Sequence, residues 1–408
     1  MDQNSGAAVA ANQSHPLPGG RGEGRTHGAN DGHGHRPVAI IGGGPVGMSL
    51  ALALHKQGVA TEIHDARARG AAIGDKRILA LSHGSQQILA NLGVWDGIRA
   101  TPIRNIHVSQ RGAAGRTRIS AQEEGVAALG YVASSSDIAA ALDQALTTAN
   151  IPFIGDSRLL DTVVGNDTVM LMCSSGRSEA RLVAYAEGRV GEDAEDVVER
   201  DYDQHALICL LTPQSPHGGT AWERFTTHGP FALLPYENDY AAVYVCKPEE
   251  AERLKALPDA ELLGHLQAEF GPRVQFGAVQ GRFIYPLGLR YRRASTAKRQ
   301  VWLGNAAQTL HPVAGQGFNL ALRDCMALAR CLADVADPGT PEVLARYAAD
   351  RRMDRRGTIG ITDGLIRLFS NDDPILKHAR GAALIALDLL PPLRSFLARR
   401  MMFGARAW

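Results

Sequence analysis

A glycine-rich turn near the start of the chain constrains the fold more than any other feature. Val38–Ile41 is a short apolar, β-branched run typical of a buried strand. The sequence Gly-Gly-Gly-Pro-Val-Gly follows at 42–47, and helical spacing runs from Pro45 to Gln57. Ala60–Asp65 has the composition of a second strand. This order of strand, glycine turn, helix and strand predicts the opening of a dinucleotide-binding fold.

Each glycine of the Gly-x-Gly-x-x-Gly pattern has its own steric reason. Gly42 allows a tight turn out of the strand, and Gly44 lets the backbone approach a pyrophosphate without a Cβ in the way. Gly47 lets the helix pack closely on the sheet. Pro45 and Val46 begin the helix, whose free N–H groups and positive dipole end favour a diphosphate.

An acidic residue ends the second strand of this unit. Asp65 stands 18 positions after Gly47, where a carboxylate accepts hydrogen bonds from ribose hydroxyls. A free 2′-hydroxyl favours FAD or NAD over NADP at this site. The alternative is a glycine-rich turn without a ligand, which the strand and helix on either side disfavour.

Residues 1–36 are rich in Gly, His, Asn and Ser, so we expect a disordered tail. Later spacing predicts helices over 75–95, 137–149, 250–270 and 317–335, and strands at 168–173, 206–211, 241–246 and 301–303. The strand-like runs between about 151 and 245 are separated by Gly, Pro and Asn/Asp turns, which favours an antiparallel sheet. The fold class is therefore α/β, with a Rossmann-like domain interleaved with an antiparallel-sheet domain, followed by a helical C-terminal layer.

Composition excludes several classes of protein. Lys plus Arg (43) balance Asp plus Glu (42), so nothing favours nucleic acid as a partner. The five cysteines form no pair or Cys/His cluster, which disfavours structural zinc and a disulfide framework. We interpret Cys325 and Cys331 as small core residues.

No run approaches the roughly 18 apolar residues of a membrane-spanning helix, and the N-terminus lacks the order of a secretory signal. We expect a cytoplasmic protein. The apolar segment 381–393, followed by Arg394, Arg399 and Arg400, is expected to pack on the core or on a partner subunit. Peripheral contact with the inner membrane is the alternative.

A second glycine element lies at 304–324, with the sequence GNAAQTLHPVAGQGFNLALRD. A short strand leads through a loop to Gly-Gln-Gly-Phe-Asn, which opens a helix. Its positive N-terminal end suits the negative charge that a reduced isoalloxazine ring carries.

This stretch resembles the second FAD motif of the ubiquinone-biosynthesis FAD-dependent hydroxylases, a family of aromatic-ring flavoprotein monooxygenases. GDKRILALSHGSQQILANLGVW (74–95), LGYVASSSDIAAAL (129–142) and GPFALLPY (229–236) are similar to further segments of that family. The resemblance covers about 37–404 and implies a para-hydroxybenzoate-hydroxylase-like FAD-binding fold. It implies an FAD-binding domain at 37–100, 129–190 and 281–335, a substrate domain at 101–128 and 191–280, and a helical layer at 336–408.

The resemblance also implies the cofactor contacts, although no catalytic residue. The residues expected to hold the ADP half of FAD are Gly42, Gly44, Pro45, Val46, Gly47 and Asp65. Those expected nearer the flavin are Arg77, Asn305, Gly315, Gln316, Gly317, Phe318 and Asn319. The family's Asp-Gly pair is replaced by Glu187-Gly188, and the serine expected three residues after this glycine is missing.

The implied reaction is external monooxygenation of an aromatic ring. NADH or NADPH reduces the flavin, O2 adds to it, and the resulting flavin hydroperoxide hydroxylates a polyprenylated phenol, a ubiquinone precursor. A soluble aromatic substrate and a non-catalytic FAD-binding scaffold of a biosynthetic complex are the alternatives. A disulfide reductase is disfavoured because no cysteine precedes Cys173. We interpret His311 as a loop histidine rather than a base, and His217 and His228 as structural.

Overall fold

The computed structural model describes residues 36–112, 115–191, 196–312, 315–369 and 374–406. The tail expected at 1–36 lies outside this set apart from Arg36, which begins the first strand. Both glycine turns are described, except for Val313 and Ala314 immediately before the second one.

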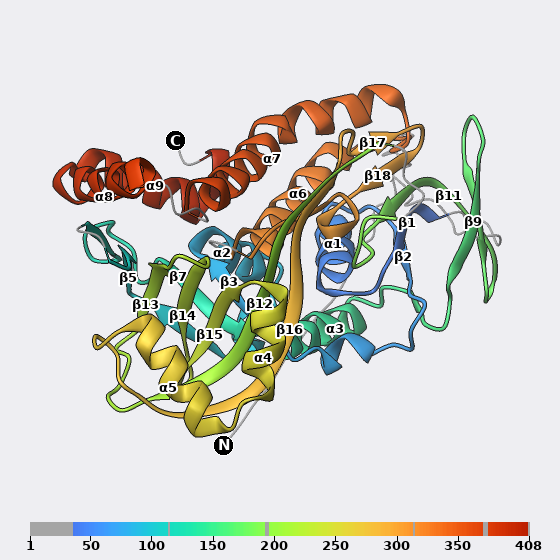
Figure 1. Cartoon of the computed structure of the whole chain (residues 1–408). Helices are drawn as coiled ribbons and strands as arrows, with labels where there is room; N and C mark the ends of the chain where they lie inside the picture. Colours follow the sequence, from blue (N-terminus) through green and yellow to red (C-terminus); the bar gives the residue numbers. More distant parts are fainter. Residues whose placement is uncertain (1–35, 113–114, 192–195, 313–314, 370–373, 407–408) are drawn as a thin grey trace, which may run out of the picture. The chain divides into compact units, whose positions relative to one another are not determined.

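A mainly parallel sheet carries the expected dinucleotide fold (Figure 1). Its strands run in the order β17-β18-β11-β1-β2-β8, and β1 pairs in parallel with both β2 and β11. Their bounds are β1 Arg36–Ile41, β2 Thr61–His64, β8 Phe153–Ile154, β11 Gly176–Tyr185, β17 Thr296–Ala297 and β18 Gln300–Trp302. The strands expected at 38–41, 60–65 and 301–303 are thus confirmed, with boundaries shifted by one or two residues.

The two faces of this sheet are both buried, which explains its continuous apolar strands. One face packs against the helices α1 (Pro45–Lys56), α3 (Ser135–Thr148) and α6 (Gln316–Leu332). The other face packs against an antiparallel ribbon of β9 (Leu159–Val164) and β10 (Val169–Cys173), which extends from β11.

Residues 75–95, expected as one helix, divide into a strand and a helix. Ile78–Ser82 forms β3, which pairs with β7 (Gly130–Ser134) in a three-stranded sheet with β4 (Ala100–Ile103). The helix α2 begins at His83, where the Ser82 side chain caps it, and ends at Asn91. The helical expectation for the first part was wrong because pairing with β7 comes from distant residues and outweighs the local apolar spacing.

The expected antiparallel sheet is confirmed for residues 197–246, which contribute to an eight-stranded sheet, here called the large sheet. The strand expected at 168–173 instead forms β10 of the mainly parallel sheet. Its strand order is β19-β16-β12-β15-β14-β13-β5-β6, and the β13–β5 pair is parallel. The bounds are β5 Asn105–Gln110, β6 Arg116–Ser120, β12 Val197–Pro213, β13 Thr220–Phe225, β14 Pro230–Tyr236, β15 Asp239–Cys246, β16 Phe276–Arg292 and β19 Gln308–Thr309.

Two helices cover one face of the large sheet (Figure 1). They are α4 (Pro248–Ala256) and α5 (Asp259–Phe270), so the single helix expected over 250–270 is corrected to two. The break falls at Leu257 and Pro258, whose extended backbone caps both helices; proline restricts the preceding residue in this way. Leu262, Leu266 and Phe270 bury this face, while the opposite face turns toward the β3-β7-β4 sheet.

The chain ends in helices, as expected. After α6 come α7 (Pro341–Phe369), α8 (Pro374–Leu389) and α9 (Pro391–Phe403). Cys325 and Cys331 are both buried in α6, in agreement with their interpretation as core residues. Within the described part of the chain, no single helix is long and apolar enough to span a bilayer. The segments Arg380–Leu389 and Pro391–Phe403 pass that test only as a pair bent by 100°.

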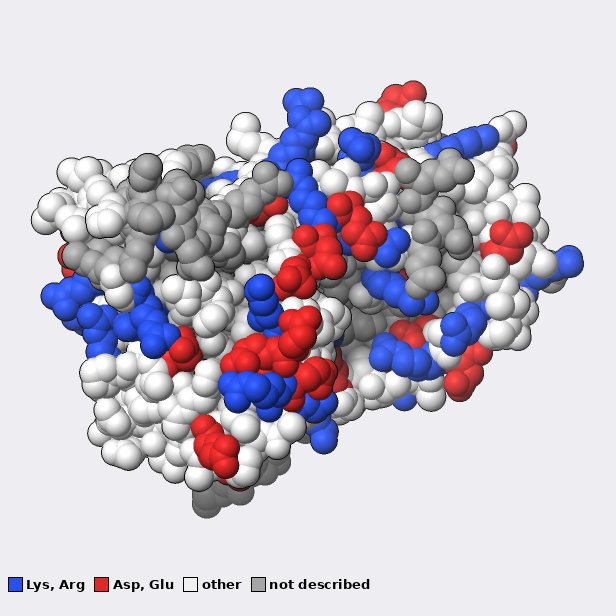
Figure 2. Space-filling model, in the orientation of Figure 1, with Lys and Arg blue, Asp and Glu red and all other residues white. Residues whose placement is uncertain are grey.

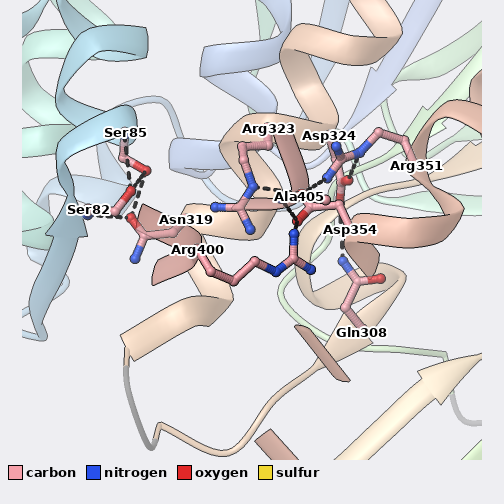
Figure 3. Close-up of polar contacts among 10 residues, drawn as sticks. All are labelled: Ser82, Ser85, Gln308, Asn319, Arg323, Asp324, Arg351, Asp354, Arg400 and Ala405. Carbon is pink, nitrogen blue, oxygen red and sulfur yellow. Dashed lines mark hydrogen bonds and ion pairs between the residues drawn. The ribbon is translucent and has the colours of Figure 1, made fainter. Parts of the chain in front are cut away.

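Buried ion pairs fasten α7 to α6 (Figure 3). The Nε of Arg351 donates to Asp324 at 2.6 Å, and its guanidinium also reaches Asp354 at 2.7 Å. Asp354 accepts a further bond from Arg323 at 2.7 Å and one from the backbone N–H of Ala405 at 2.9 Å. Burial alone would raise the pKa of Asp354, but Arg323 and Arg351 outweigh it and lower this pKa to about 2. The network therefore ties the last turn of the chain to the helix that carries the second glycine turn.

We expect Asp354→Asn to lower the free energy of unfolding by about 3 kcal/mol, because it leaves buried guanidinium groups without their carboxylate. The folded-state pKa of Asp354 lies below its ordinary 3.8. Its contribution should therefore be complete above pH 4 and fall as the pH drops toward about 2. Urea unfolding followed by circular dichroism measures both effects. Asp96→Asn, at an exposed position, is the matched control, and equal stability of the two variants would contradict this account.

Candidate functional site

The first glycine turn is shaped by backbone contacts that exclude side chains. A Cβ on Gly42, whose φ is 111°, would lie 2.7 Å from the carbonyl oxygen of Ala186. A Cβ on Gly47 would lie only 1.9 Å from the carbonyl oxygen of Gly42. The helix α1 thus begins in direct contact with the end of β1, as the motif predicts.

Gly44 differs from these two, because no described atom lies within 4 Å of where its Cβ would stand. It is the N-cap of α1 and has no side-chain cap, and the first helical bond runs from Met48 N–H to the Gly44 carbonyl. The N–H groups of Val46 and Gly47 precede that bond and therefore have no partner within the helix. An open space beside such groups at a positive helix end fits a diphosphate.

The carboxylate of Asp65 accepts a hydrogen bond from the backbone of the same turn. Its Oδ2 accepts from the backbone N–H of Gly43 at 2.6 Å, and its Oδ1 accepts from that of Arg67 at 2.8 Å. The carboxylate is buried at the carboxyl end of β2, while the side chain of Arg67 is largely exposed. Asp65 is therefore next to the open side of Gly44, and ribose binding by its remaining lone pairs stays a prediction.

The second glycine turn is held against β3. Gly315 caps α6 with a φ of 58°, and its Cβ would stand 3.0 Å from that of Ala80. The amide of Asn319 donates to the carbonyl oxygens of Ala80 at 2.9 Å and Gly315 at 2.6 Å. Its oxygen accepts from Ser82 N–H at 2.8 Å and from Ser85 Oγ at 2.6 Å (Figure 3). Asn319 thus locks the turn to β3 and α2, and its amide is already satisfied by protein groups.

The helices that follow the two glycine turns, α1 and α6, pack closely against each other. A Cβ on Gly304, at the end of β18, would stand 3.1 Å from the side chain of Val46 and 3.5 Å from that of Ala321. The Cys325 thiol donates to the Val46 carbonyl at 3.5 Å. Phe318 packs on the same core as α1. The first turn is therefore next to α6, and one FAD site shared by the two turns stays a prediction.

The remaining expected flavin-side residues lie at the edges of this region. Asn305 donates to the Gly188 carbonyl at 3.3 Å. Gln316 is buried, and Gly317 has open space where a Cβ would stand. Arg77, at the start of β3, donates to both oxygens of Asp75 at 2.6 to 3.0 Å and stays half-exposed. Its guanidinium is thus held in place yet remains accessible.

Glu187, the departure from the family pattern, faces the first turn. Partial burial raises the pKa of its carboxyl, Arg189 and Arg292 lower it, and Asp65 raises it again. The backbone N of Glu187 would lie 3.0 Å from a Cβ on Gly42. This departure from the family pattern is therefore next to the first glycine turn.

The three histidines fit structural interpretations to different degrees. His217 has both ring nitrogens within hydrogen-bonding distance of backbone groups, at 2.8 Å from the Glu237 carbonyl and 3.0 Å from the Gly219 N–H, in agreement with a structural role. Burial lowers the pKa of His311 to about 4, so its ring is neutral at physiological pH. His228 is exposed in the turn between β13 and β14.

Sequence reasoning did not single out Glu223, a deeply placed acid in β13, because one acid in an alternating strand gives no local signal.

Comparison with known protein families identifies the group to which this chain belongs. Residues 35–358 match the FAD binding domain family. The chain belongs to this family. The FAD-binding domain thus covers both glycine turns, and the enzymes of the group are FAD-dependent aromatic hydroxylases.

The chain is similar to several ubiquinone hydroxylases of this family. It is 33% identical over 386 residues to ubiquinone hydroxylase UbiL of Rhodospirillum rubrum, covering 90% of this chain and 89% of the relative. It is 28% identical to the 3-demethoxyubiquinol 3-hydroxylase of Escherichia coli, covering 86% and 94%. The crystal structure of p-nitrophenol 4-monooxygenase PnpA from Pseudomonas putida has the same fold, with a TM-score of 0.74, 16% identity and coverage of 91% and 99%. The chain is thus an FAD-dependent monooxygenase of the ubiquinone-hydroxylase group.

Two glycine variants should separate folding from cofactor binding. Gly47→Ala forces a Cβ onto the Gly42 carbonyl, so we expect it to lower the Tm of the apoprotein markedly. Gly44→Ala places its Cβ in open space, so we expect a normal apoprotein Tm and an affinity for FAD reduced at least about tenfold. Thermal unfolding and FAD titration by flavin fluorescence measure the two effects. If Gly44→Ala bound FAD as tightly as the wild type does, the diphosphate would not lie beside Gly44.

Proposed function

We propose that this FAD-dependent monooxygenase hydroxylates the aromatic ring of a polyprenylated phenol, a precursor of ubiquinone. The observation that carries the proposal is the 33% sequence identity to ubiquinone hydroxylase UbiL, which extends along about nine-tenths of both chains. The close packing of α1 on α6, the helices that follow the two glycine turns, supports one FAD spanning both turns. The electron donor would be NADH or NADPH, which binds transiently.

The proposed reaction balances as a monooxygenation. Two electrons from the nicotinamide reduce O2, one oxygen atom enters the ring as a hydroxyl group, and the other leaves as water. FAD, when bound, supplies this redox chemistry. The protein's part is to hold the ring beside the cofactor and to exclude water. The apolar face of the large sheet, which turns toward β3 and β7, suits that part.

The activity is tested on purified protein loaded with FAD. We expect a yellow protein whose NADH or NADPH oxidation is stimulated at least about tenfold by 2-prenylphenol, with a product one oxygen atom heavier by mass spectrometry. Gly44→Ala is the control for dependence on FAD. A protein that binds FAD but never consumes NADH or NADPH would support the scaffold alternative.

The substrate class is tested in cells. Deletion of the encoding gene should lower ubiquinone and accumulate a polyprenylated phenol lacking one hydroxyl group. Normal ubiquinone with retained phenol hydroxylation in the purified protein would favour a soluble aromatic substrate instead.

We further propose that the bend between α8 and α9 contacts a lipid surface, because a polyprenylated substrate resides in the bilayer. These helices bury Leu384, Ala398 and Met402 against the rest of the chain. The apolar side chains that they leave exposed are Ile385, Leu389, Leu390, Leu393 and Phe396, with Leu389 71% exposed. Figure 2 shows mainly uncharged side chains at the tip of this corner, among those that it does not draw in grey. Such a cluster suits shallow insertion beneath the headgroups.

Vesicle sedimentation tests this surface. We expect wild-type protein to bind phosphatidylglycerol-containing vesicles and the double variant Leu389→Glu with Leu393→Glu to lose most of that binding. The same variant should keep its FAD affinity, because the bend is not part of the glycine turns. Exposed Leu160, changed to Glu, is the matched control. Unchanged vesicle binding in the double variant would rule out this corner as the contact.

A further inference from the structure

The face of the large sheet left uncovered by α4 and α5 carries one carboxylate among apolar side chains. Cross-strand pairing places Glu223 of β13 between Val108 of β5 and Ala232 of β14. The same row continues through Val243 of β15 and Ile208 of β12. Since residues directly opposite one another share a face, the carboxylate has only apolar neighbours along this row.

This face looks toward the flavin side of the molecule. Ala221 and Phe225 point the same way as Glu223, because side chains alternate along a strand. Ala221 packs with Ile103 of β4 and residues of β7, and Phe225 packs with Ile366 of α7. Glu223 therefore lies between the β3-β7-β4 sheet on one side and α7 on the other.

Aromatic side chains on β16 extend the same face toward Arg77. Phe283 is opposite Ile208 and Tyr285 is opposite Ala206, and these two rings remain 45% and 38% exposed. Asp75 contributes most to the raised pKa of Arg77, and Tyr285 adds to it, so Tyr285 lies close to that guanidinium. An apolar, partly aromatic wall thus runs from Arg77 to Glu223.

One oxygen of the Glu223 carboxyl is enclosed without a partner, although the residue as a whole is partly exposed. Its Oε1 is inaccessible to solvent and has no hydrogen-bond partner in the described structure. Burial is the one cause that shifts its pKa, and it raises this pKa to about 7. The titratable groups that face this side of the sheet include Tyr236, Tyr285, Asp363 and Arg380. None of them shifts the pKa of Glu223, and Asp363 is already engaged by Arg200 and Tyr202.

An acid without a partner at such depth costs stability unless something else binds it. The group that fits is a donor on an otherwise apolar ligand, because the side chains directly opposite Glu223, Val108 and Ala232, are apolar. A phenol meets this description, with one hydroxyl group on an aromatic ring.

We propose that Glu223 binds the phenolic hydroxyl group of the substrate and accepts its proton, as a catalytic residue of the hydroxylation. This inference rests on the proposed function and names the part of the substrate that the large sheet recognises. In the proposed step the phenolic O–H bond breaks, the proton moves to the carboxylate of Glu223, and the electron pair stays on the phenol oxygen. That oxygen then donates electron density to the ring and makes its ortho and para carbons more nucleophilic.

The remaining atoms balance within the proposed reaction. The attacked ring carbon gains an oxygen atom from O2 and releases its hydrogen as a proton. Glu223 returns its own proton to the phenolate oxygen of the product. The oxidant is O2 and the reductant is NADH or NADPH.

Glu223→Gln tests the proton transfer, with 2-prenylphenol as the probe and the FAD-loaded enzyme. We expect unchanged FAD affinity and at least about 100-fold less hydroxylated product. In the wild type, product formation should rise as the pH passes through about 7, because only the ionised carboxylate accepts a proton. This rise should be absent in Glu223→Gln. Glu261→Gln, at an exposed position on α5, is the matched control. Wild-type product formation and pH profile in Glu223→Gln would overturn the inference while leaving the proposed function intact.

Infrared spectroscopy gives a readout that does not need turnover. At pH 6 the wild type should show a protonated carboxyl band that is absent from Glu223→Gln, and 2-prenylphenol should shift this band. If the wild type formed no product, the proposed function would fail, and the shift would still decide whether Glu223 binds a phenol. A band that the phenol leaves unmoved would overturn the inference.

Thermal unfolding separates a binding role from a structural one. Glu223→Leu removes an unpaired buried acid, so we expect an unchanged or higher Tm together with loss of the phenol-induced infrared shift. A strong fall in Tm would show that Glu223 supports the fold instead, and would contradict the inference.

Discussion

The close approach of α1 and α6 at the carboxyl edge of the parallel sheet is the constraint on which the rest of the structure depends. Small residues make this approach possible, since a Cβ on Gly47 would collide with the carbonyl of Gly42, and a Cβ on Gly304 would crowd Val46 and Ala321. Larger side chains would push the helices apart, and would thereby move their positive N-terminal ends away from each other. A dinucleotide cofactor needs both ends together, one for its diphosphate and one for the flavin.

The second turn is positioned from outside the parallel sheet. The side-chain amide of Asn319 forms hydrogen bonds to β3, to α2 and to the backbone of Gly315. The N-terminus of α6 is therefore fixed to the β3-β7-β4 sheet, which contacts the large sheet. The far part of α6 is held by the pair of Asp324 and Arg351. The cofactor side and the substrate side are therefore joined through hydrogen bonds that are buried or partly buried, which suits a reaction that must exclude water.

The two faces of the large sheet differ in how they are covered. One face is closed by α4 and α5 around Phe231 and Phe270, which gives it rigidity. The other face keeps Phe283 and Tyr285 partly exposed and holds Glu223 without a partner. Partly exposed aromatic rings beside an unpartnered acid oxygen suit a ligand surface better than a purely structural one.

Local pattern was sufficient wherever the chemistry of a few adjacent residues determines the structure. The first strand, glycine turn and helix followed from residues 38–57, because glycines at fixed spacing and a β-branched run leave little alternative. The antiparallel sheet and the C-terminal helices followed from turn residues and spacing. Local pattern failed at β3, where apolar spacing resembled a helix and pairing with β7 made a strand. It also missed the break before Pro258.

The sequence by itself determined that this chain would have a dinucleotide-type fold with two glycine turns, because steric exclusion at a glycine is a local property. Only the tertiary structure decided that α1 and α6 meet and that Asn319 serves as a clamp. It also decided that Glu223 stands alone in an apolar row built from five strands. The physical reason is that burial and pairing depend on residues more than a hundred positions apart, as for Glu223 and Val108, and no local spacing records them.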